Sequence, residues 1–142
     1  MVESKTMNHS YQYLKQKVER ATPTELIVLL YEGEIKFLNQ AKEEARNGDL
    51  PKRCENLIKA QDVLRELRNA LDMSVTEISP KLKSLYNYMI EKLVQANLEK
   101  KDEHIDEVLK LVTELKDVWI LVNKEIRKQN NQQAMEGLSI TA

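Results

Sequence analysis

The chain has 142 residues, of which 32% are charged, a formal net charge of -1, and only three glycines and three prolines. This composition is typical of one domain of long helices, and the mixing of both charge signs along the chain excludes the basic surface that nucleic acid requires. The single cysteine, Cys54, excludes an internal disulfide and fits a reducing compartment.

The first segment, residues 1–21, has few apolar residues, but they are regularly spaced. Met7, Tyr11, Leu14 and Val18 follow a three-four spacing, which allows a narrow amphipathic helix. A helix this short is marginal in water on its own. The segment is therefore either a frayed terminus or an arm that docks on the rest of the chain.

A strong helix start follows at residue 22. The run Thr22-Pro23-Thr24-Glu25 is a capping box with proline at the first helical position. We expect this helix to end at Asn47-Gly48, where glycine can take the left-handed closing conformation. The residues that we expect on its core face are Leu26, Leu30, Gly33, Phe37 and Ala41, with Gly33 allowing a neighbouring backbone to approach closely.

Two further helices follow. The second opens near Asp49, with Pro51 in its first turn, and lasts to about Leu71. The third begins at Ser79-Pro80, a cap followed by proline, and fades between Asn97 and Lys101. Their core stripes are Leu57, Ala60, Leu64, Leu67 and Leu71, and then Leu82, Tyr86, Met89, Leu93 and Ala96.

The fourth helix, from Asp102 to about Arg127, carries the longest apolar seam. The seam consists of Ile105, Val108, Val112, Leu115, Trp119, Val122 and Ile126. Such a seam cannot stay in water, so it needs partner helices of matching length. Residues 129–142 are polar and lack a sustained stripe, which predicts a mobile tail.

These elements predict an all-α fold. Four amphipathic helices joined by short loops should form an antiparallel up-down four-helix bundle with an N-terminal amphipathic arm. The expected boundaries are an arm at 1–21, a bundle at 22–128 and a tail at 129–142.

The helices carry more apolar residues than one core needs. On the first helix Val28, Tyr31, Ile35 and Leu38 form a second row, and Ile58, Ile90, Val94, Leu98, Leu109 and Ile120 lie off the core stripes of the others. Isolated surface aliphatics are ordinary, but aligned rows mark a docking surface for another helix. The amphipathic arm could occupy the same docking surface as an intramolecular competitor of that partner.

The sequence contains none of the common catalytic or metal-binding motifs that we considered. Neither His9 nor His104 follows a glutamate by three residues, so the Glu-x-x-His pairs of di-iron bundles are absent, and no phosphate loop or nucleophile elbow occurs. We therefore expect no enzyme activity, no metal and no cofactor. No apolar run has the length of a signal peptide or a membrane span, so we expect a cytoplasmic protein without membrane insertion.

The order of certain residues resembles the flagellin-specific export chaperones of bacterial flagella. The opening block is Tyr13-x4-Val18-x2-Ala21-Thr22-Pro23-x-Glu25-Leu26-Ile27-x-Leu29-Leu30-Tyr31-x-Gly33. Three further blocks are Asn56-Leu57-Ile58-Lys59-Ala60-Gln61, Leu85-Tyr86-Asn87-Tyr88-Met89 with Leu93, Ala96 and Asn97, and Ile105-x2-Val108 with Leu115-Lys116-Asp117-x-Trp119. Small departures are Asn87, where aspartate is usual, and Val118, where alanine is common.

The resemblance implies a bundle that binds the disordered C-terminal segment of flagellin, which becomes helical on the chaperone. It also implies that the client is kept from premature polymerisation in the cytosol and handed to the flagellar type III export gate. It further implies that the N-terminal segment around Tyr13 occupies part of the client site, while the residue spacing favours Tyr11 and Leu14; the choice between Tyr11 and Tyr13 stays open.

We predict a client groove on the surplus apolar surface. The residues expected to line it or to bond the client are Val28, Tyr31, Ile35, Asn56, Ile58, Gln61, Ile90, Val94 and Asn97, although Asn97 fits a helix end equally well. The arm residues expected to compete with the client are Met7, Tyr11, Tyr13, Leu14 and Val18. An alternative is a self-assembling structural or adaptor bundle without a client, whereas a chaperone should be a monomer or weak homodimer when free.

Overall fold

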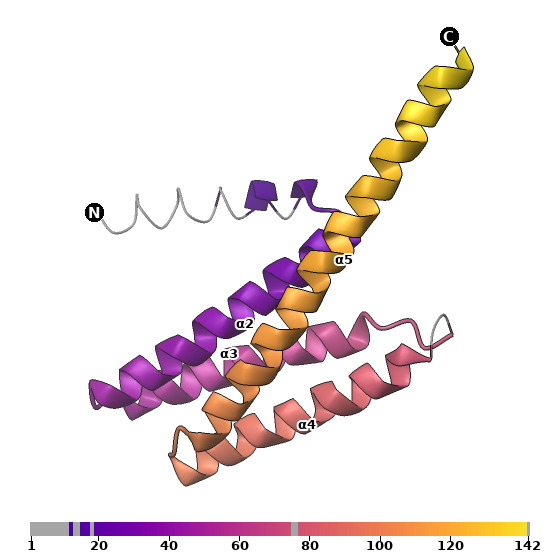
Figure 1. Ribbon diagram of the computed structural model, residues 1–142. Coiled ribbons are helices and arrows are strands. Elements are labelled where there is room, and N and C mark those ends of the chain that lie inside the picture. The colour runs from indigo at the N-terminus through magenta and orange to yellow at the C-terminus, as the bar shows by residue number, and fades with distance from the viewer. Residues whose placement is uncertain (1–11, 13–14, 18, 75–76, 142) are drawn as a thin grey trace. The chain divides into compact units, whose positions relative to one another are not determined.

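Four long helices make up most of the computed structural model, which describes residues 12, 15–17, 19–74 and 77–141 (Figure 1). They are α2 (Pro23–Arg46), α3 (Leu50–Asn69), α4 (Ile78–Glu99) and α5 (Glu103–Thr141). No strand occurs in these described ranges. The all-α helical bundle expected from the sequence is confirmed.

The chain divides into two units. The central unit is Leu30–Val118, and the terminal unit combines Met1–Leu29 with Trp119–Ala142. In the central unit the chain reverses direction at each short connection (Figure 1). The division into an arm, a bundle and a tail that the sequence favours stays a prediction.

The core of the central unit combines aliphatic side chains with two tyrosines and a methionine. Its buried apolar residues are Tyr31, Leu38, Ala41, Leu57, Ala60, Leu64, Leu67, Tyr86, Met89, Ile90, Leu93, Ala96, Ile105, Val108 and Val112. Helices α3 and α4 approach each other most closely. Ala60 and Ala96 lie fully buried on these two helices, and their small side chains allow such an approach.

The helix ends follow the local chemistry of the sequence. The Thr22 hydroxyl accepts from the amide of Glu25 at 3.2 Å, and the Glu25 carboxylate accepts from the Thr22 amide at 3.4 Å, so the capping box is confirmed. Gly48 has a φ of 77°, the left-handed conformation expected there. The Asp49 carboxylate then caps α3 by accepting from the amide of Lys52 at 3.1 Å.

Three expectations about local structure are wrong. Helix α4 begins at Ile78, so Ser79 lies inside its first turn instead of capping it. Tyr31 and Leu38 are fully buried, although the sequence pattern places them off the core face of α2. A Cβ added at Gly33 would meet nothing within 4 Å, so no backbone of the described residues approaches this glycine closely.

Helix α5 is longer than expected. It continues from Glu103 to Thr141, past the end near Arg127 that the apolar seam indicates. The seam is fully buried at Ile105, Val108 and Val112 but exposed at Val122 and Ile126. Its N-terminal half therefore belongs to the core, and its C-terminal half remains an apolar stripe open to solvent. Mobility of residues 129–142 stays a prediction.

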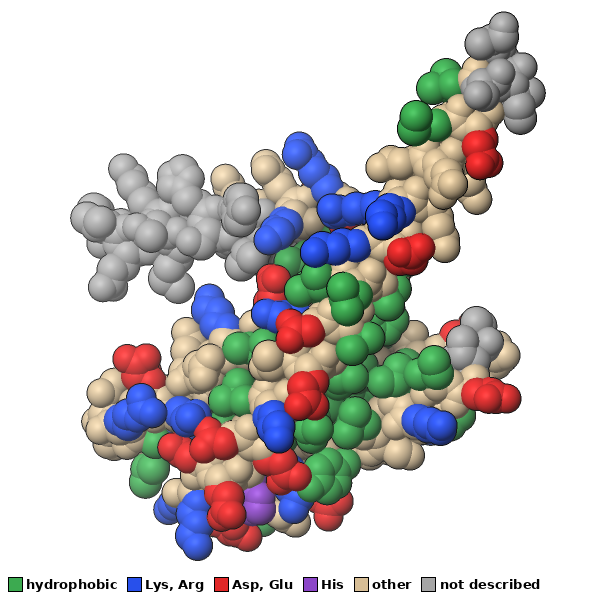
Figure 2. All heavy atoms as spheres, in the orientation of Figure 1, with side chains coloured by type: hydrophobic (Ala, Val, Ile, Leu, Met, Phe, Trp, Pro, Cys, Tyr) green, Lys and Arg blue, Asp and Glu red, His purple; other side chains and the backbone are tan. Residues whose placement is uncertain are grey.

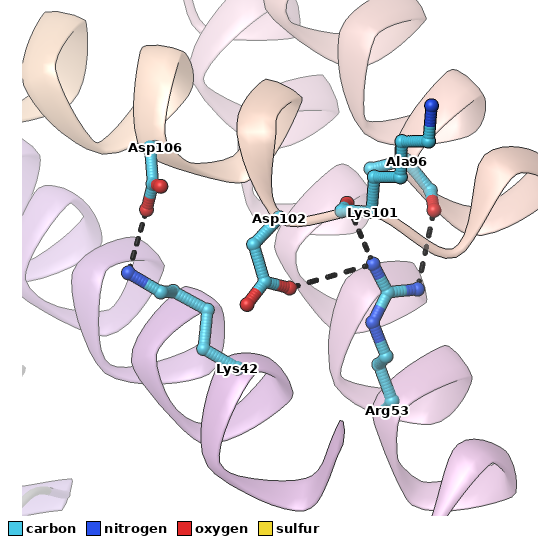
Figure 3. A network of polar contacts seen from close by, with 6 residues as sticks. All are labelled: Lys42, Arg53, Ala96, Lys101, Asp102 and Asp106. Atoms are coloured by element: carbon cyan, nitrogen blue, oxygen red, sulfur yellow. Dashed lines mark hydrogen bonds and ion pairs between the residues drawn. The ribbon is translucent and has the colours of Figure 1, made fainter. Parts of the chain in front are cut away.

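A buried arginine fixes the turn between α4 and α5 (Figure 3). Arg53 is 2% exposed, and its Nη1 donates to the carbonyl of Ala96 at 3.1 Å while Nη2 donates to the carbonyl of Lys101 at 2.9 Å. The Asp102 carboxylate lies 3.8 Å from the same Nη2. Because the last carbonyls of a helix lack partners, this guanidinium holds the end of α4 against α3.

Candidate docking groove

A groove runs between α3 and α4, at the surface beside their buried contact. Its volume is about 360 Å³. The residues that line it are Cys54, Ile58 and Gln61 from α3 and Val94, Asn97 and Leu98 from α4.

The helical repeat of α3 places its three lining residues on one face. Cys54, Ile58 and Gln61 are four and three residues apart, next to the stripe that packs on α4. Ile58 is 47% exposed and Val94 is 40% exposed, so the groove has an accessible branched side chain on each of its two helices. The groove therefore offers apolar surface to another helix.

The polar side chains of the groove are partly bonded to its own walls. The Asn97 Nδ2 donates to the Cys54 Sγ at 3.3 Å, a contact across the groove between the two helices. Arg65 Nη2 donates to the Gln61 Oε1 at 3.3 Å, which orients an amide that is only 6% exposed. These contacts hold both amides in place at the groove walls.

Four of the nine predicted residues come together here. Ile58, Gln61, Val94 and Asn97 all line the groove, and Cys54 and Leu98 join them without having been predicted as site residues. Leu98 belongs to the apolar residues off the core stripe of the third predicted helix, so this pattern could have identified it as a groove residue. Cys54 lies one turn before Ile58, but a lone cysteine in a helix resembles a core residue.

The other predicted residues have different surroundings. Ile90 is buried below the surface of α4, and the Asn56 amide donates to the Lys52 carbonyl of its own helix at 2.9 Å. Val28 and Ile35 are half-buried on α2. Tyr31 is predicted from the sequence to contact the client. Its side chain is fully buried in the core, so it is not accessible at the surface.

Comparison with known proteins identifies the family of this chain. A family model described as Flagellar protein FliS matches residues 6–126. The chain belongs to the FliS family. This membership confirms the resemblance seen in the sequence.

Several curated relatives are similar over most of their length. The chain is 36% identical over 119 residues to the flagellar secretion chaperone FliS of Bacillus subtilis, which covers 84% of this chain and 89% of that protein. It is 31% identical over 121 residues to the flagellar secretion chaperone FliS of Salmonella typhimurium, covering 84% and 90%. It is 31% identical over 104 residues to that of Vibrio cholerae, covering 72% and 76%.

The predicted arm of this FliS-family chain falls largely outside the described residues. Met7, Tyr11, Tyr13, Leu14 and Val18 all lie there. The described neighbours Gln16, Lys17 and Arg20 form, with Glu25, a shallow polar pocket in the terminal unit. In the same unit Arg127 Nη2 donates to the Glu25 carboxylate at 2.9 Å, which lowers the pKa of Glu25.

The exposed part of the α5 seam is a second apolar surface. Figure 2 shows hydrophobic side chains among the acidic and basic ones on the visible face of the helices. Val122 and Ile126 of the seam lie in the terminal unit with exposed side chains, and the neighbouring Leu121 is exposed as well. This stripe is an additional candidate for contact with a partner helix.

The described residues contain neither a candidate metal-binding cluster nor a candidate membrane-spanning helix. No group of three His, Cys, Asp or Glu side chains among them could hold a metal ion. No helix in the same part of the chain has the length and apolar content needed to cross a membrane.

Proposed function

We propose that this FliS-family chain is a flagellar secretion chaperone that binds the disordered C-terminal segment of flagellin. It keeps the segment from polymerising prematurely in the cytoplasm and delivers it to the flagellar type III export gate. The similarity to proteins named flagellar secretion chaperones supports the chaperone role. The single structural observation that supports a client site is the uncovered apolar groove between α3 and α4.

The groove has the chemistry of a helix-in-groove site. Ile58, Val94 and Leu98 expose apolar surface along two packed helices, and an amphipathic helix can bury its apolar face there. A client that folds as it binds loses part of the gross binding energy to ordering, of order 2–5 kcal/mol. Such a complex is specific because its interface is large, yet it can release its client without nucleotide hydrolysis.

The proposed client contacts are the residues that line the groove. The groove residues Ile58, Val94 and Leu98 supply the apolar contacts, and Gln61 and Asn97 supply hydrogen bonds. Val28, Ile35, Asn56 and Ile90 stay predictions on the flanking surfaces. The hydroxyls of Tyr31 and Tyr86 share a buried hydrogen bond of 2.5 Å, so Tyr31 acts from the core by supporting α2 and α4.

The test places two carboxylates in the groove. The double variant Ile58→Asp with Val94→Asp should abolish binding of a labelled flagellin C-terminal peptide, because a charge buried without a partner is strongly unfavourable. Binding is measured by fluorescence anisotropy, and far-UV circular dichroism checks that the helices remain.

The matched control lies outside the groove. Met73 and Ile78 are also exposed apolar residues, and Met73→Asp with Ile78→Asp introduces the same two charges elsewhere. This control should bind the peptide like the wild type. Equal affinity of the groove variant and the wild type would place the client elsewhere.

The exposed α5 stripe favours a second candidate function, a self-assembling structural or adaptor protein. In that case the stripe pairs with a second copy of the chain rather than with a client. Sedimentation velocity at several concentrations separates the two functions. The chaperone is a monomer or weak homodimer alone and forms a one-to-one complex with the client, whereas the adaptor assembles without one.

A further inference from the structure

The α3–α4 groove alternates polar and apolar side chains along its length. Cys54 meets Asn97 at one end, Ile58 and Val94 occupy the middle, and Gln61 lies at the other end. Cys54 and Gln61 are seven residues apart on α3, which is about 10 Å along the helix axis. The groove thus carries an amide at each end of an apolar centre.

The order of these residues along the groove follows from two contacts between the helices. Asn97 contacts Cys54 at 3.3 Å, and farther along α3 Arg68 Nη1 donates to the Asn87 side chain at 2.8 Å. Residue numbers rise on α3 while they fall on α4, so the pair is antiparallel. Gln61 therefore lies opposite the turn that ends at Val94, away from Asn97.

Each of these two groove-lining amides keeps one atom without a hydrogen bond to the described residues. Gln61 uses its Oε1 to accept from Arg65, and its Nε2 makes no hydrogen bond to the described residues. Asn97 uses Nδ2 on a thiol, which is a weak acceptor, and its Oδ1 likewise has no partner within the described ranges. One end of the groove thus presents a donor and the other end an acceptor.

We propose that Gln61 and Asn97 set the register of the bound client helix, an inference that rests on the proposed chaperone function. The client must place side chains that form hydrogen bonds, Asn, Gln, Ser or Thr, seven residues apart. Apolar side chains between them meet Ile58 and Val94. Positions seven residues apart lie on the same face of a helix, so both polar side chains reach the groove together.

A client helix shifted by one turn would lose both hydrogen bonds. The shift brings apolar side chains against Gln61 and Asn97 and buries the Gln61 Nε2 and the Asn97 Oδ1 without a client partner, which is unfavourable. It also sets polar client side chains against Ile58 and Val94. A single polar position fixes the register of a coiled coil in the same way. The two amides therefore select one register among several that apolar contact alone would allow.

Cys54 makes the register measurable, because it is the only cysteine of the chain and lines the groove. The probe is a set of peptides covering the last part of the cognate flagellin, each with one cysteine at a successive position. Mild oxidation with oxidised glutathione joins the cysteine nearest Cys54 to it, and mass spectrometry gives the yield at each position. In the wild type the yields should show one sharp maximum at a single position.

The mapped register is itself a test that requires no variant. It must place Asn, Gln, Ser or Thr opposite both Gln61 and Asn97. Apolar side chains at both positions, or equal yields at all positions, would overturn the inference.

A variant tests the role of Gln61 directly. Gln61→Met keeps the side-chain length but removes the hydrogen bonds, so the maximum should broaden by one helical turn in each direction. The control Gln40→Met replaces an exposed amide on α2 and should keep the wild-type pattern. A single sharp maximum in Gln61→Met contradicts the register role, whereas absence of peptide binding to the wild type contradicts the chaperone function itself.

Discussion

At the scale of single residues, the core of α2 contains an acidic side chain that no neighbour neutralises. Glu34 is fully buried between Tyr31 and Leu38 on the same face of the helix. Both of its carboxylate oxygens lack a hydrogen-bond partner among the described residues. Burial raises the pKa of Glu34 well above its ordinary value. The buried Glu34 carboxyl group therefore lowers the free energy of unfolding by an amount that depends on pH.

We predict that Glu34→Gln stabilises the protein, and increasingly so as the pH rises. Above the ordinary glutamate pKa the unfolded chain releases its proton while the folded chain retains it, so wild-type stability falls with pH up to the raised folded pKa. Each tenfold difference in proton affinity corresponds to about 1.4 kcal/mol. Urea unfolding near pH 5 and near pH 8 measures the effect.

The control for this prediction is an exposed acid on the same helix. Glu32→Gln removes one charge from the surface of α2 and should change stability little at either pH. A stabilisation by Glu34→Gln that stayed constant between the two pH values would show that ionisation of Glu34 does not limit stability.

At the scale of one helix, the glycine in the middle of α2 has no packing role within the described structure. Open space surrounds the position of an added Cβ at Gly33. Gly33→Ala should therefore raise the free energy of unfolding by about 0.5–1 kcal/mol, because alanine loses less backbone entropy in a helix. Urea unfolding followed by circular dichroism measures the change.

Gly48 provides the opposite control. Its φ of 77° is a conformation that alanine adopts with strain, so Gly48→Ala should lower stability. Destabilisation by Gly33→Ala would mean that another group occupies the space beside α2.

The sequence predicts the helices well because their signals are local. The capping box at Thr22, the closing Gly48 and the seam of α5 depend only on neighbouring residues. The core face of α2 could not be chosen in this way, because Leu30 and Tyr31 belong to two different regular apolar rows. Tertiary packing decides between two rows that the helical period allows equally.

The groove is predictable only in part for a related reason. Ile58 and Val94 are recognisable as outward residues on their own helices. That they line one groove, with Cys54 against Asn97, depends on the antiparallel offset between α3 and α4. Sequence periodicity gives a face for each helix but not the offset between two helices, so the lining of the groove requires the structure.

At the scale of the whole molecule, this FliS-family chain exposes apolar surface in both of its units. The groove lies in the central unit, and the exposed C-terminal part of the seam lies mostly in the terminal unit. A stable monomer with such surfaces gains free energy by covering them, at roughly 25 cal/mol per Å² of apolar area. We infer that a foreign helical segment provides the cover.

The most direct test is a calorimetric titration of the full chain with a peptide of about 40 residues from the C-terminus of the cognate flagellin, a length that can bury on the order of 1,000–3,000 Å² as it folds. The account predicts one peptide bound per chain and a negative heat-capacity change, because apolar surface is buried. Absence of binding heat across several temperatures, with the chain folded, would contradict it.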